Sequence, residues 1–258
     1  MSLLHIAKAV VSLLMGQSRL VRLRADRTIV FIGDTHGDID ATEKVLARYP
    51  IPDCTLVFLG DAVDRGPDSA GNLRLILQAK LDHPTSIHLL MGNHEAWAIA
   101  PFTPADFWNG LDTRESETIA KALTHLPLAA HHPAGVLGLH GALPNLPSLD
   151  ALDSIEIGST AWRAITWGDW LENRADRALQ PTSRPGFERA DFDARAARFD
   201  LQVLVRSHQP SAPTYLYEDH CLTIFSSSAY GDGRRTVAIL PPDRRVSSAL
   251  DLEIQEIA

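Results

Sequence analysis

Short apolar runs alternate with amphipathic stretches through the first half of the chain. Three of these runs lead directly into a glycine: residues 28–32, 55–59 and 87–91. Continuous runs of β-branched and other apolar residues are typical of strands buried on both faces. Between them, residues 41–49 and 69–80 carry apolar side chains at helical spacing, which predicts two helices. The order strand, helix, strand, helix, strand indicates a parallel βαβαβ unit.

The second half continues the strand pattern but is interrupted by prolines. Four further apolar runs predict strands: residues 136–139, 203–205, 222–225 and 236–240. The last two flank Gly231 and Gly233, so we expect them to pair with each other. Residues 106–125 and 192–199 are predicted helices, whereas residues 162–186, rich in Trp, Arg and Pro, predict a long loop. Loops of that length inside a compact domain usually carry function.

Both ends of the chain are fairly apolar. Residues 3–15 predict an amphipathic helix, because Lys8 interrupts a stretch that is too short to span a bilayer. The C-terminal tail, residues 241–258, fits either an edge strand or a dimer contact through its apolar residues Leu250, Leu252, Ile254 and Ile257. The sequence therefore predicts no particular oligomeric state. We expect a single domain over residues 1–258, with residues 1–24 forming a helix and lead-in segment packed on it.

The overall charge limits the classes of partner. Basic residues number 24 and acidic residues 32, for a net charge of −8. This argues against a protein that holds nucleic acid or an anionic membrane through bulk charge. A phosphate-bearing ligand would therefore need a local positive centre. The two cysteines, Cys54 and Cys221, lie in strand-like stretches and imply no disulfide framework, so we expect a cytoplasmic protein.

Polar clusters follow five of the predicted strands. They read GDTHG from residue 33, GDAVDRG from residue 60, GNHE from residue 92, HG from residue 140 and SH from residue 207. In open α/β sheets the ligand crevice lies outside the carboxyl ends of the strands. We therefore expect the five clusters to converge on one site.

Six residues of these clusters are candidate metal ligands: Asp34, His36, Asp61, Asn93, His140 and His208. Oxygen and imidazole donors without a thiolate suit manganese, iron or zinc better than a soft metal. Six such ligands can hold two divalent ions if one carboxylate bridges them. We expect manganese first, with iron, zinc or cobalt as alternatives.

The same motifs, in this order and spacing, resemble the phosphoprotein phosphatase family of serine/threonine phosphatases, which belongs to the calcineurin-like metallophosphoesterases. The likeness extends to residues 20–23, 126–129, 143–144 and 225–230. It implies an α/β fold in which two mixed β-sheets pack as a central sandwich flanked by helices. The implied activity is dephosphorylation of phosphoserine and phosphothreonine in proteins, with phosphotyrosine also open.

The resemblance divides the ligands between two ions. Asp34 and His36 are implied to bind the first ion and Asp61 to bridge both, while three residues are implied to bind the second: Asn93, His140 and His208. Two ions held this way lower the pKa of a shared water, so that a bridging hydroxide can attack phosphorus in line.

The resemblance also identifies the proton donor. His94 resembles the general acid and Asp64 its hydrogen-bond partner. An alkoxide leaves poorly unless it is protonated, and a carboxylate in contact with an imidazole favours the protonated ring. Glu95 is equally suited to cap a following helix and to act in the site.

Two arginines are expected to clamp the phosphate. Arg65 matches the family position, and a bidentate guanidinium suits phosphate oxygens. The second clamp is expected in the long loop, where Arg184 is the candidate and Arg174 or Arg177 could serve instead. Tyr230 is a candidate for the border of the site through its hydroxyl.

Two other functions compete with phosphoprotein hydrolysis. A symmetrical dinucleoside tetraphosphate hydrolase shares the metal motifs, but Glu95 stands where that group tends to carry Asp. A catalytically inactive phosphoprotein-binding module would have lost a ligand, whereas all six ligands, His94 and Asp64 are present. The leading hypothesis is therefore a metal-dependent enzyme whose partner is a phosphorylated protein or peptide.

Overall fold

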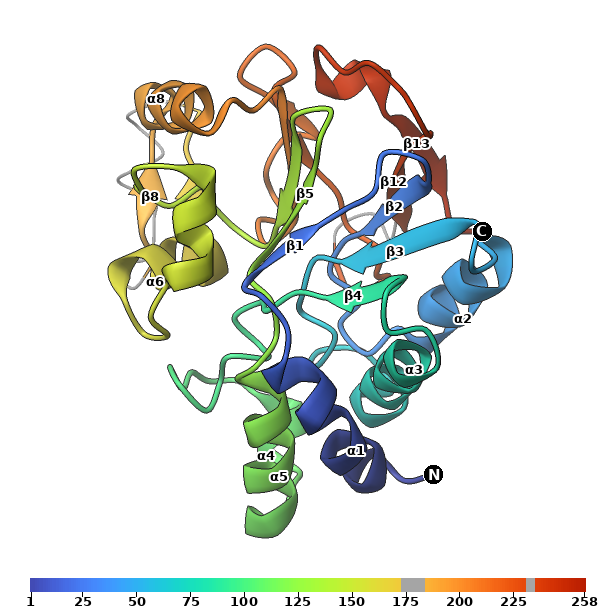
Figure 1. The fold of residues 1–258 in the computed structure, drawn as a ribbon. Coiled ribbons are helices and arrows are strands. Elements are labelled where there is room, and N and C mark those ends of the chain that lie inside the picture. The colour runs from blue at the N-terminus through green and yellow to red at the C-terminus, as the bar shows by residue number, and fades with distance from the viewer. Residues whose placement is uncertain (173–183, 231–234) are drawn as a thin grey trace.

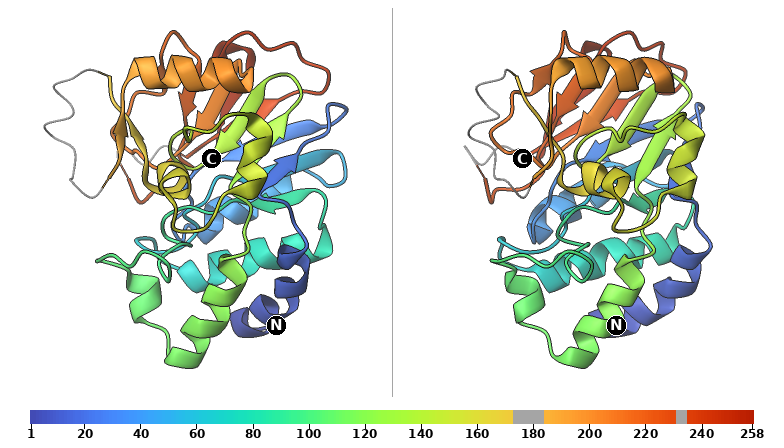
Figure 2. Two further views of the ribbon diagram at one scale, coloured as in Figure 1. Left: turned by 60° about the vertical axis from the view of Figure 1, so that its left-hand side comes forward. Right: turned by 90° about the vertical axis from the view of Figure 1, so that its left-hand side faces the viewer.

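The computed structural model describes residues 1–172, 184–230 and 235–258, and two mixed β-sheets form its centre. The sheets lie face to face and helices pack around them, as the successive views in Figures 1 and 2 show. The predicted α/β sandwich flanked by helices is therefore confirmed.

The five-stranded sheet contains the predicted parallel unit. Its order is β13 (Glu253–Glu256), β12 (Thr236–Leu240), β2 (Thr28–Ile32), β3 (Cys54–Phe58) and β4 (Ile87–Leu89). Strands β2, β3 and β4 run parallel to one another, while β12 pairs antiparallel with β2 and β13 pairs antiparallel with β12. The C-terminal tail thus forms the edge strand of this sheet.

The six-stranded sheet is built mostly from the second half of the chain. Its order is β1 (Leu20–Arg22), β5 (Ala129–His132), β6 (Val136–Leu139), β9 (Val203–Arg206), β11 (Cys221–Thr223) and β10 (Tyr215–Leu216). Strand β9 lies parallel to both β6 and β11, so the strands that lead to residues 140 and 207 end at the same edge. The lead-in segment contributes β1, which pairs with β5.

The two faces of β2 belong to two different cores. Ile29 and Phe31 are buried in the cluster between the sheets, whereas Val30 and Ile32 are buried in the cluster that includes the helices. Successive side chains of a strand point to opposite faces, which explains why the run is apolar at every position. The sheets approach closely: a Cβ built on Gly138 of β6 would lie 2.7 Å from the ring of Phe31.

Helices cover the outer faces. Five of them precede β5: α1 (Leu3–Met15), α2 (Ile39–Arg48), α3 (Ser69–Asp82), α4 (Asp106–Asn109) and α5 (Thr113–Leu123). Three helices are capped by an aspartate whose carboxylate accepts a hydrogen bond from a backbone N–H of the first turn: Asp38, Asp68 and Asp112. Helix α1 packs against α3 and α5.

A second group of elements lies at another side of the sandwich. It comprises η1 (Leu149–Ser154), α6 (Thr160–Trp167), β7 (Asp169–Trp170), β8 (Gly186–Phe187) and α8 (Arg189–Phe199). A further 3-10 turn, η2 (Ala249–Asp251), lies elsewhere and directly precedes β13. Strands β7 and β8 pair in parallel as a separate two-stranded sheet. Figure 1 shows α6, β8 and α8 on the side opposite α2 and α3.

Three predictions of local structure were wrong. The helix expected over 106–125 is two helices, α4 and α5, because the chain turns at Gly110 and Asp112 starts a new capping box. The long loop expected over 162–186 contains most of α6 as well as β7. The apolar runs around residues 222–225 and 236–240 do not pair as a hairpin, since β11 and β12 belong to different sheets. Gly231 and Gly233 lie outside the described residues.

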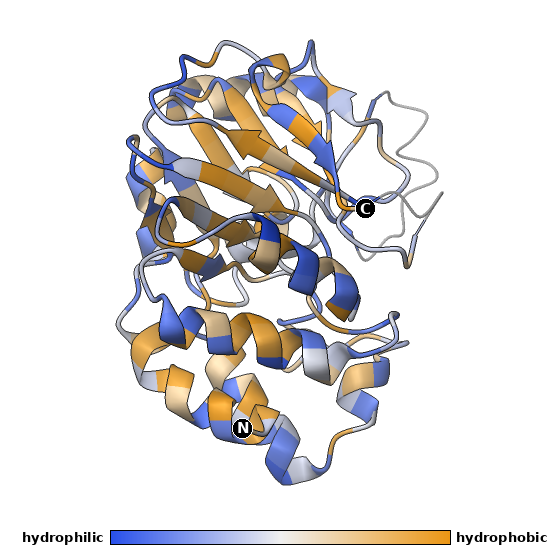
Figure 3. Cartoon of the chain, turned by 90° about the vertical axis from the view of Figure 1, so that its right-hand side faces the viewer, coloured by the Kyte–Doolittle hydropathy of each residue, from blue (hydrophilic) through white to orange (hydrophobic). Residues whose placement is uncertain are grey.

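Hydropathy follows the layers. The strands are mostly hydrophobic along their length, while several helices carry one hydrophobic and one hydrophilic side (Figure 3). Among the described residues, no helix is both long enough and apolar enough to cross a membrane.

Candidate metal centre

The five polar clusters converge on one buried site. The six candidate ligands and His94 are between 0 and 4% exposed, although they come from loops after β2, β3, β4, β6 and β9. The convergence expected from the strand ends is therefore observed. Whether each residue binds a metal stays a prediction, and the geometry below shows which atoms could do so.

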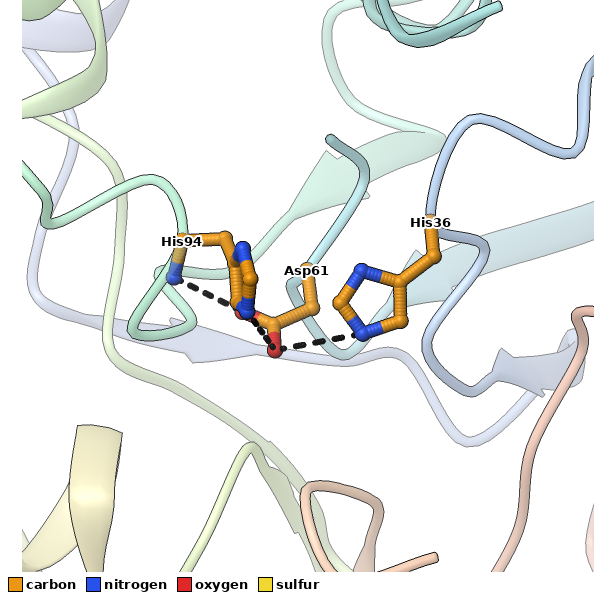
Figure 4. Close-up of side chains that lie close together, drawn as sticks. All are labelled: His36, Asp61 and His94. Atoms are coloured by element: carbon orange, nitrogen blue, oxygen red, sulfur yellow. Dashed lines mark hydrogen bonds and ion pairs between the residues drawn. The ribbon is translucent and has the colours of Figure 1, made fainter. Parts of the chain in front are cut away.

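Asp61 lies at the centre of the site. Its Oδ2 is 3.7 Å from Nε2 of His36 and 3.8 Å from Nε2 of His94, and Figure 4 shows the two rings on either side of this carboxylate. Nε2 of His140 is 3.4 Å from the same oxygen. One oxygen of Asp61 thus lies within 3.8 Å of histidines from three different loops.

Asp34 supplies the second buried carboxylate. Its Oδ2 is 3.7 Å from Nε2 of His36, and its Oδ1 is 3.5 Å from Nδ1 of His140 and accepts a hydrogen bond from the Ser207 hydroxyl. Asp34 therefore lies close to His36, with which the resemblance groups it, and also close to His140; the division of these residues between two ions stays a prediction.

The remaining candidates gather around His140. Its Nε2 is 3.2 Å from Oδ1 of Asn93 and 3.0 Å from Nδ1 of His208. Asp61, His140 and His208 offer donor atoms within 4.8 Å of one another. Asp61 is also 3.7 Å from Nε2 of His36, which in turn is 3.7 Å from Asp34. The two groups share Asp61, so the cluster can be divided between two neighbouring cations.

The electrostatics of the cluster favour bound cations. Burial and the adjacent Asp61 carboxylate raise the pKa of Asp34 to about 7. Burial lowers the pKa of His140, but Asp61 and Asp34 outweigh it and bring the pKa to about 9. Burial lowers the pKa of His36 to about 3, which keeps this ring in the neutral form that ligates metals. Two buried carboxylates that repel each other, next to the neutral imidazole of His36, fit divalent metals.

Glu95 holds the turn that carries Asp61. Its buried carboxylate accepts three backbone hydrogen bonds, from the N–H groups of Asp61, Ala62 and Gly92, at 2.7 to 2.9 Å. Asp61 itself has a φ of 54°, a left-handed conformation that is rare outside glycine. The suggestion that Glu95 caps a helix was wrong, because residues 93–99 form turns.

His94 is oriented by Asp64. Its Nδ1 is 2.6 Å from Oδ2 of Asp64, whose Oδ1 accepts a hydrogen bond of 2.7 Å from the Phe107 backbone. The ring also packs edge-on against Phe102 at a centroid distance of 4.7 Å. These contacts direct Nε2 toward Asp61, and the predicted pairing of His94 with Asp64 is present.

A cavity of about 540 Å³ opens at the cluster. Asn93, Arg65 and Arg184 line it on the polar side, and Phe102 and Trp167 are among its apolar lining residues. Both expected phosphate clamps thus face one cavity beside a predicted metal ligand. Arg184 lies 3.6 Å from Asp169 and 5.9 Å from the Trp167 ring centroid. The alternatives Arg174 and Arg177 lie outside the described residues.

Tyr230 borders the site. Its hydroxyl is 3.1 Å from Nε2 of His36, and the Arg65 guanidinium lies 5.1 Å from the centre of its ring. Burial raises the pKa of the Tyr230 hydroxyl, so it stays protonated and can donate a hydrogen bond. The Tyr230 hydroxyl therefore lies at the edge of the cluster, and its part in the site stays a prediction.

Sequence reasoning missed Asp169. This buried carboxylate on β7 has Oδ1 3.4 Å from Nε2 of His208 and Oδ2 3.6 Å from Nη1 of Arg184. It connects a candidate ligand with a candidate clamp, and such outer partners orient ligating histidines. The available signal was its position directly after Trp167 and Gly168 within the segment already suspected of function.

The fold and the metal-type cluster define a metallophosphoesterase. Residues 27–212 match the family model described as calcineurin-like phosphoesterase, and the chain belongs to that family.

Curated proteins similar to this chain include serine/threonine-protein phosphatases. The chain is 28% identical over 246 residues to serine/threonine-protein phosphatase BSL2 of Arabidopsis thaliana, a match that covers 84% of this chain and 24% of the relative. It is 26% identical over 242 residues to the PP2A-like serine/threonine-protein phosphatase PPG1 of Saccharomyces cerevisiae, covering 90% of this chain and 65% of the relative. The chain thus spans less than two thirds of either relative.

A solved structure shows the same fold. A protein serine/threonine phosphatase of Saccharomyces cerevisiae, described as similar to human phosphatase PP5, superposes with a TM-score of 0.79 at 23% identity. The superposition covers 98% of this chain and 88% of that one.

Proposed function

We propose that this protein is a phosphomonoesterase that uses two divalent metal ions to dephosphorylate phosphoserine and phosphothreonine in proteins. The observation that carries the proposal is the position of the His94–Asp64 pair and two arginines around one buried carboxylate cluster. The family membership and the curated serine/threonine phosphatase relatives support the same substrate class.

The residues that would hold the ions form two groups around Asp61. Asp34 and His36 would bind on one side, and the other side would be completed by three residues: Asn93, His140 and His208. When bound, the ions supply Lewis acidity that polarises phosphoryl oxygens and makes water more acidic. We propose manganese as the first ion to test, because oxygen and nitrogen donors without thiolate accept it well.

His94 would deliver the proton to the leaving oxygen. Asp64 holds Nδ1 at 2.6 Å, so the transferable proton sits on Nε2, which faces Asp61. The alkoxide of serine or threonine is a poor leaving group, and a positioned acid is most valuable for such a group. The packing of the ring against Phe102 fixes its direction before substrate enters.

Arg65 and Arg184 would bind the phosphate oxygens. Both line the cavity next to Asn93, and a guanidinium offers two parallel donors to a phosphate. Asp169 lies beside Arg184 and restricts the guanidinium before substrate binds. The Arg184 side chain therefore loses less conformational freedom when it binds the ester. The arginines provide the local positive centre that a protein of net charge −8 needs for an anionic substrate.

A substrate panel tests the proposal. Metal-stripped protein reloaded with Mn²⁺ is assayed on phosphoserine, phosphothreonine and phosphotyrosine peptides and on diadenosine tetraphosphate, with Asp34→Asn as the blank. We expect turnover of the serine and threonine peptides that is absent in the blank. Turnover of the dinucleotide alone would assign the protein to the nucleotide hydrolases. Phosphopeptide binding without any turnover would instead indicate a binding module.

A further inference from the structure

A second cavity lies beside the one at the metal centre. Its volume is about 550 Å³, which is within the range of sites that bind small ligands. Residues of α6, β8 and α8 line it, and Figure 1 shows these three elements gathered at one side of the molecule. Phe187 and Asn145 contribute to its wall, and nothing in the proposed reaction uses this space.

The two cavities are neighbours because they share lining residues. Arg163 of α6 and Arg184 line both of them. Trp167, one turn further along α6, lines the metal-centre cavity, whereas Thr160 and Ala164 line the second. A substrate whose phosphate lies between Arg65 and Arg184 can therefore extend past Arg163 into the second cavity.

The charge of the second cavity points to an anionic ligand. Three arginines line it, Arg163, Arg184 and Arg195, and none of its described lining residues is Asp or Glu. The described lining of the metal-centre cavity also contains no acid. Guanidinium groups gathered in one hollow repel each other and attract phosphate or carboxylate, with which they form paired hydrogen bonds. Arg184 and Arg195 also lie beside carboxylates outside the lining, at 3.6 Å from Asp169 and 3.1 Å from Asp191. The excess of guanidinium groups in the lining itself is a local feature of a chain that is acidic overall.

The three arginines differ in their surroundings. Arg195 is part of the framework, because it donates to the Leu143 carbonyl at 2.7 Å, pairs with Asp191 at 3.1 Å and lies 4.1 Å over the Phe187 ring. Arg184 belongs to the proposed phosphate clamp. Arg163 is the arginine through which the second cavity can be probed without removing either of these contacts.

We propose that the second cavity is a subsite for a second anionic side chain, phosphorylated or carboxylate, on the same peptide that presents the phosphate to the metal centre. Arg163 is its specificity-determining residue. The proposal rests on the proposed function, since it concerns the peptide that the metal centre hydrolyses. It predicts a preference for phosphopeptides in which a second negative charge lies near the phosphorylated residue.

The test compares peptides that differ only in the second charge. The Mn²⁺-loaded protein is assayed on a phosphothreonine peptide with a second phosphoserine, an aspartate or an alanine placed one, two or three residues to either side. The readout is the ratio of kcat/KM between the charged and the alanine peptide. Arg163→Gln is the test variant. Arg189→Gln is the matched control, since exposed Arg189 pairs with Asp193 and Glu218 and is not among the residues that line either cavity.

We expect a preference of about tenfold for the second charge at one or more positions, which is the size of one charge-assisted hydrogen bond. Arg163→Gln should remove most of this preference through KM, and Arg189→Gln should keep it. A preference for phosphate over aspartate would identify the natural group as a second phosphate, and equal preferences would indicate any anion.

Equal turnover of charged and alanine peptides would overturn the subsite while leaving the proposed function intact, and so would a preference that survives in Arg163→Gln. If no phosphopeptide is hydrolysed but diadenosine tetraphosphate is, both the proposed function and the peptide subsite are wrong. The two failures are therefore distinguishable in one set of assays.

Discussion

Asp61 is the residue on which the site depends most. Three imidazoles lie within 3.4 to 3.8 Å of one of its oxygens, and its other oxygen accepts the backbone N–H of His94. Burial raises the pKa of this carboxyl, but His140 and His94 outweigh it and hold the pKa well below its usual range. The side chain therefore stays ionised inside the protein, where it needs a cation.

Replacing His94 should slow the reaction in a way that depends on the leaving group. We expect His94→Asn to lower kcat on a phosphoserine peptide by roughly 10²- to 10⁴-fold, the usual contribution of a positioned acid. The loss should be much smaller on p-nitrophenyl phosphate, whose leaving group needs no proton. Steady-state kinetics on both substrates measure this, and equal losses on the two would exclude the assignment of His94 as the acid.

Removing the Glu95 carboxylate should loosen the Asp61 turn. Glu95→Gln keeps the size of the side chain but cannot accept the three backbone hydrogen bonds with a charge. We expect a loss of stability of about 1.5 to 3 kcal/mol together with weaker metal binding. Denaturant unfolding and metal titration measure the two effects, and unchanged metal affinity would show that the turn does not need Glu95.

At the scale of elements, the sequence predicts a strand or helix well where a local run of residues determines it, and poorly where distant pairing determines it. Strands β2, β6 and β12 have the predicted limits, because each is a mostly apolar run bounded by a polar residue on one side and by glycine or proline on the other. Strands β1 and β10 have three and two residues and exist only through pairing with distant partners, so no local pattern predicts them.

The difference between local and distant determinants also explains which residues of the candidate site the sequence could predict. Its strand-end residues could be predicted because each directly follows a strand, whereas Asp169 does not follow a predicted strand and had only its place in the suspected segment as a signal. It reaches the site through β7, a two-residue strand whose partner lies beyond a long connecting segment. Helix α6 was missed because its aromatic and arginine content favoured a loop.

The contact between the sheets predicts the effect of a single methyl group. We expect Gly138→Ala to destabilise the protein by about 1 to 3 kcal/mol, since the added Cβ would lie 2.7 Å from the Phe31 ring within a packed core. Gly16→Ala is the control, because its added Cβ would make only ordinary contacts of 3.7 Å or more. Denaturant midpoints of the two variants test this, and similar values would contradict the close approach of the sheets.

Lys80 predicts a pH dependence of stability that the active site does not cause. This side chain of α3 is 1% exposed and donates to the Pro84 carbonyl, and burial lowers its pKa from 10.5 to about 8. Between pH 8 and 10.5 the unfolded chain therefore binds the proton and the folded protein does not. Stability should rise with pH across this window, by up to roughly 3 kcal/mol in all, and Lys80 lowers it at neutral pH.

The comparison with Lys80→Met isolates this contribution. Free energies of unfolding measured from pH 7 to 11 should rise less with pH in the variant than in the wild type. Parallel curves would show that Lys80 titrates alike in the folded and unfolded states.

At the scale of the whole molecule, the sandwich gathers acidic and imidazole side chains at the ends of both sheets. Strands β2, β3 and β4 of one sheet and β6 and β9 of the other lead to the same buried cluster. The surrounding cavities carry arginines, which reverse the sign of the acidic chain at the place where an anionic ester would enter. The acidic and imidazole side chains that would bind metal are thus buried in the cluster, while the arginines that would bind the substrate line the cavities around it.

The most direct test of this account is the number of metal ions bound per chain, measured against phosphopeptide turnover as Mn²⁺ is added to stripped protein. We predict that the wild type reaches two ions per chain and that turnover follows their binding. Asp61→Asn should bind fewer ions and lose turnover, because Asp61 lies between the proposed ligands of both ions, next to His36 on one side and His140 on the other. Full turnover with one ion or none, or two tightly bound ions in an active Asp61→Asn protein, would contradict the two-metal centre.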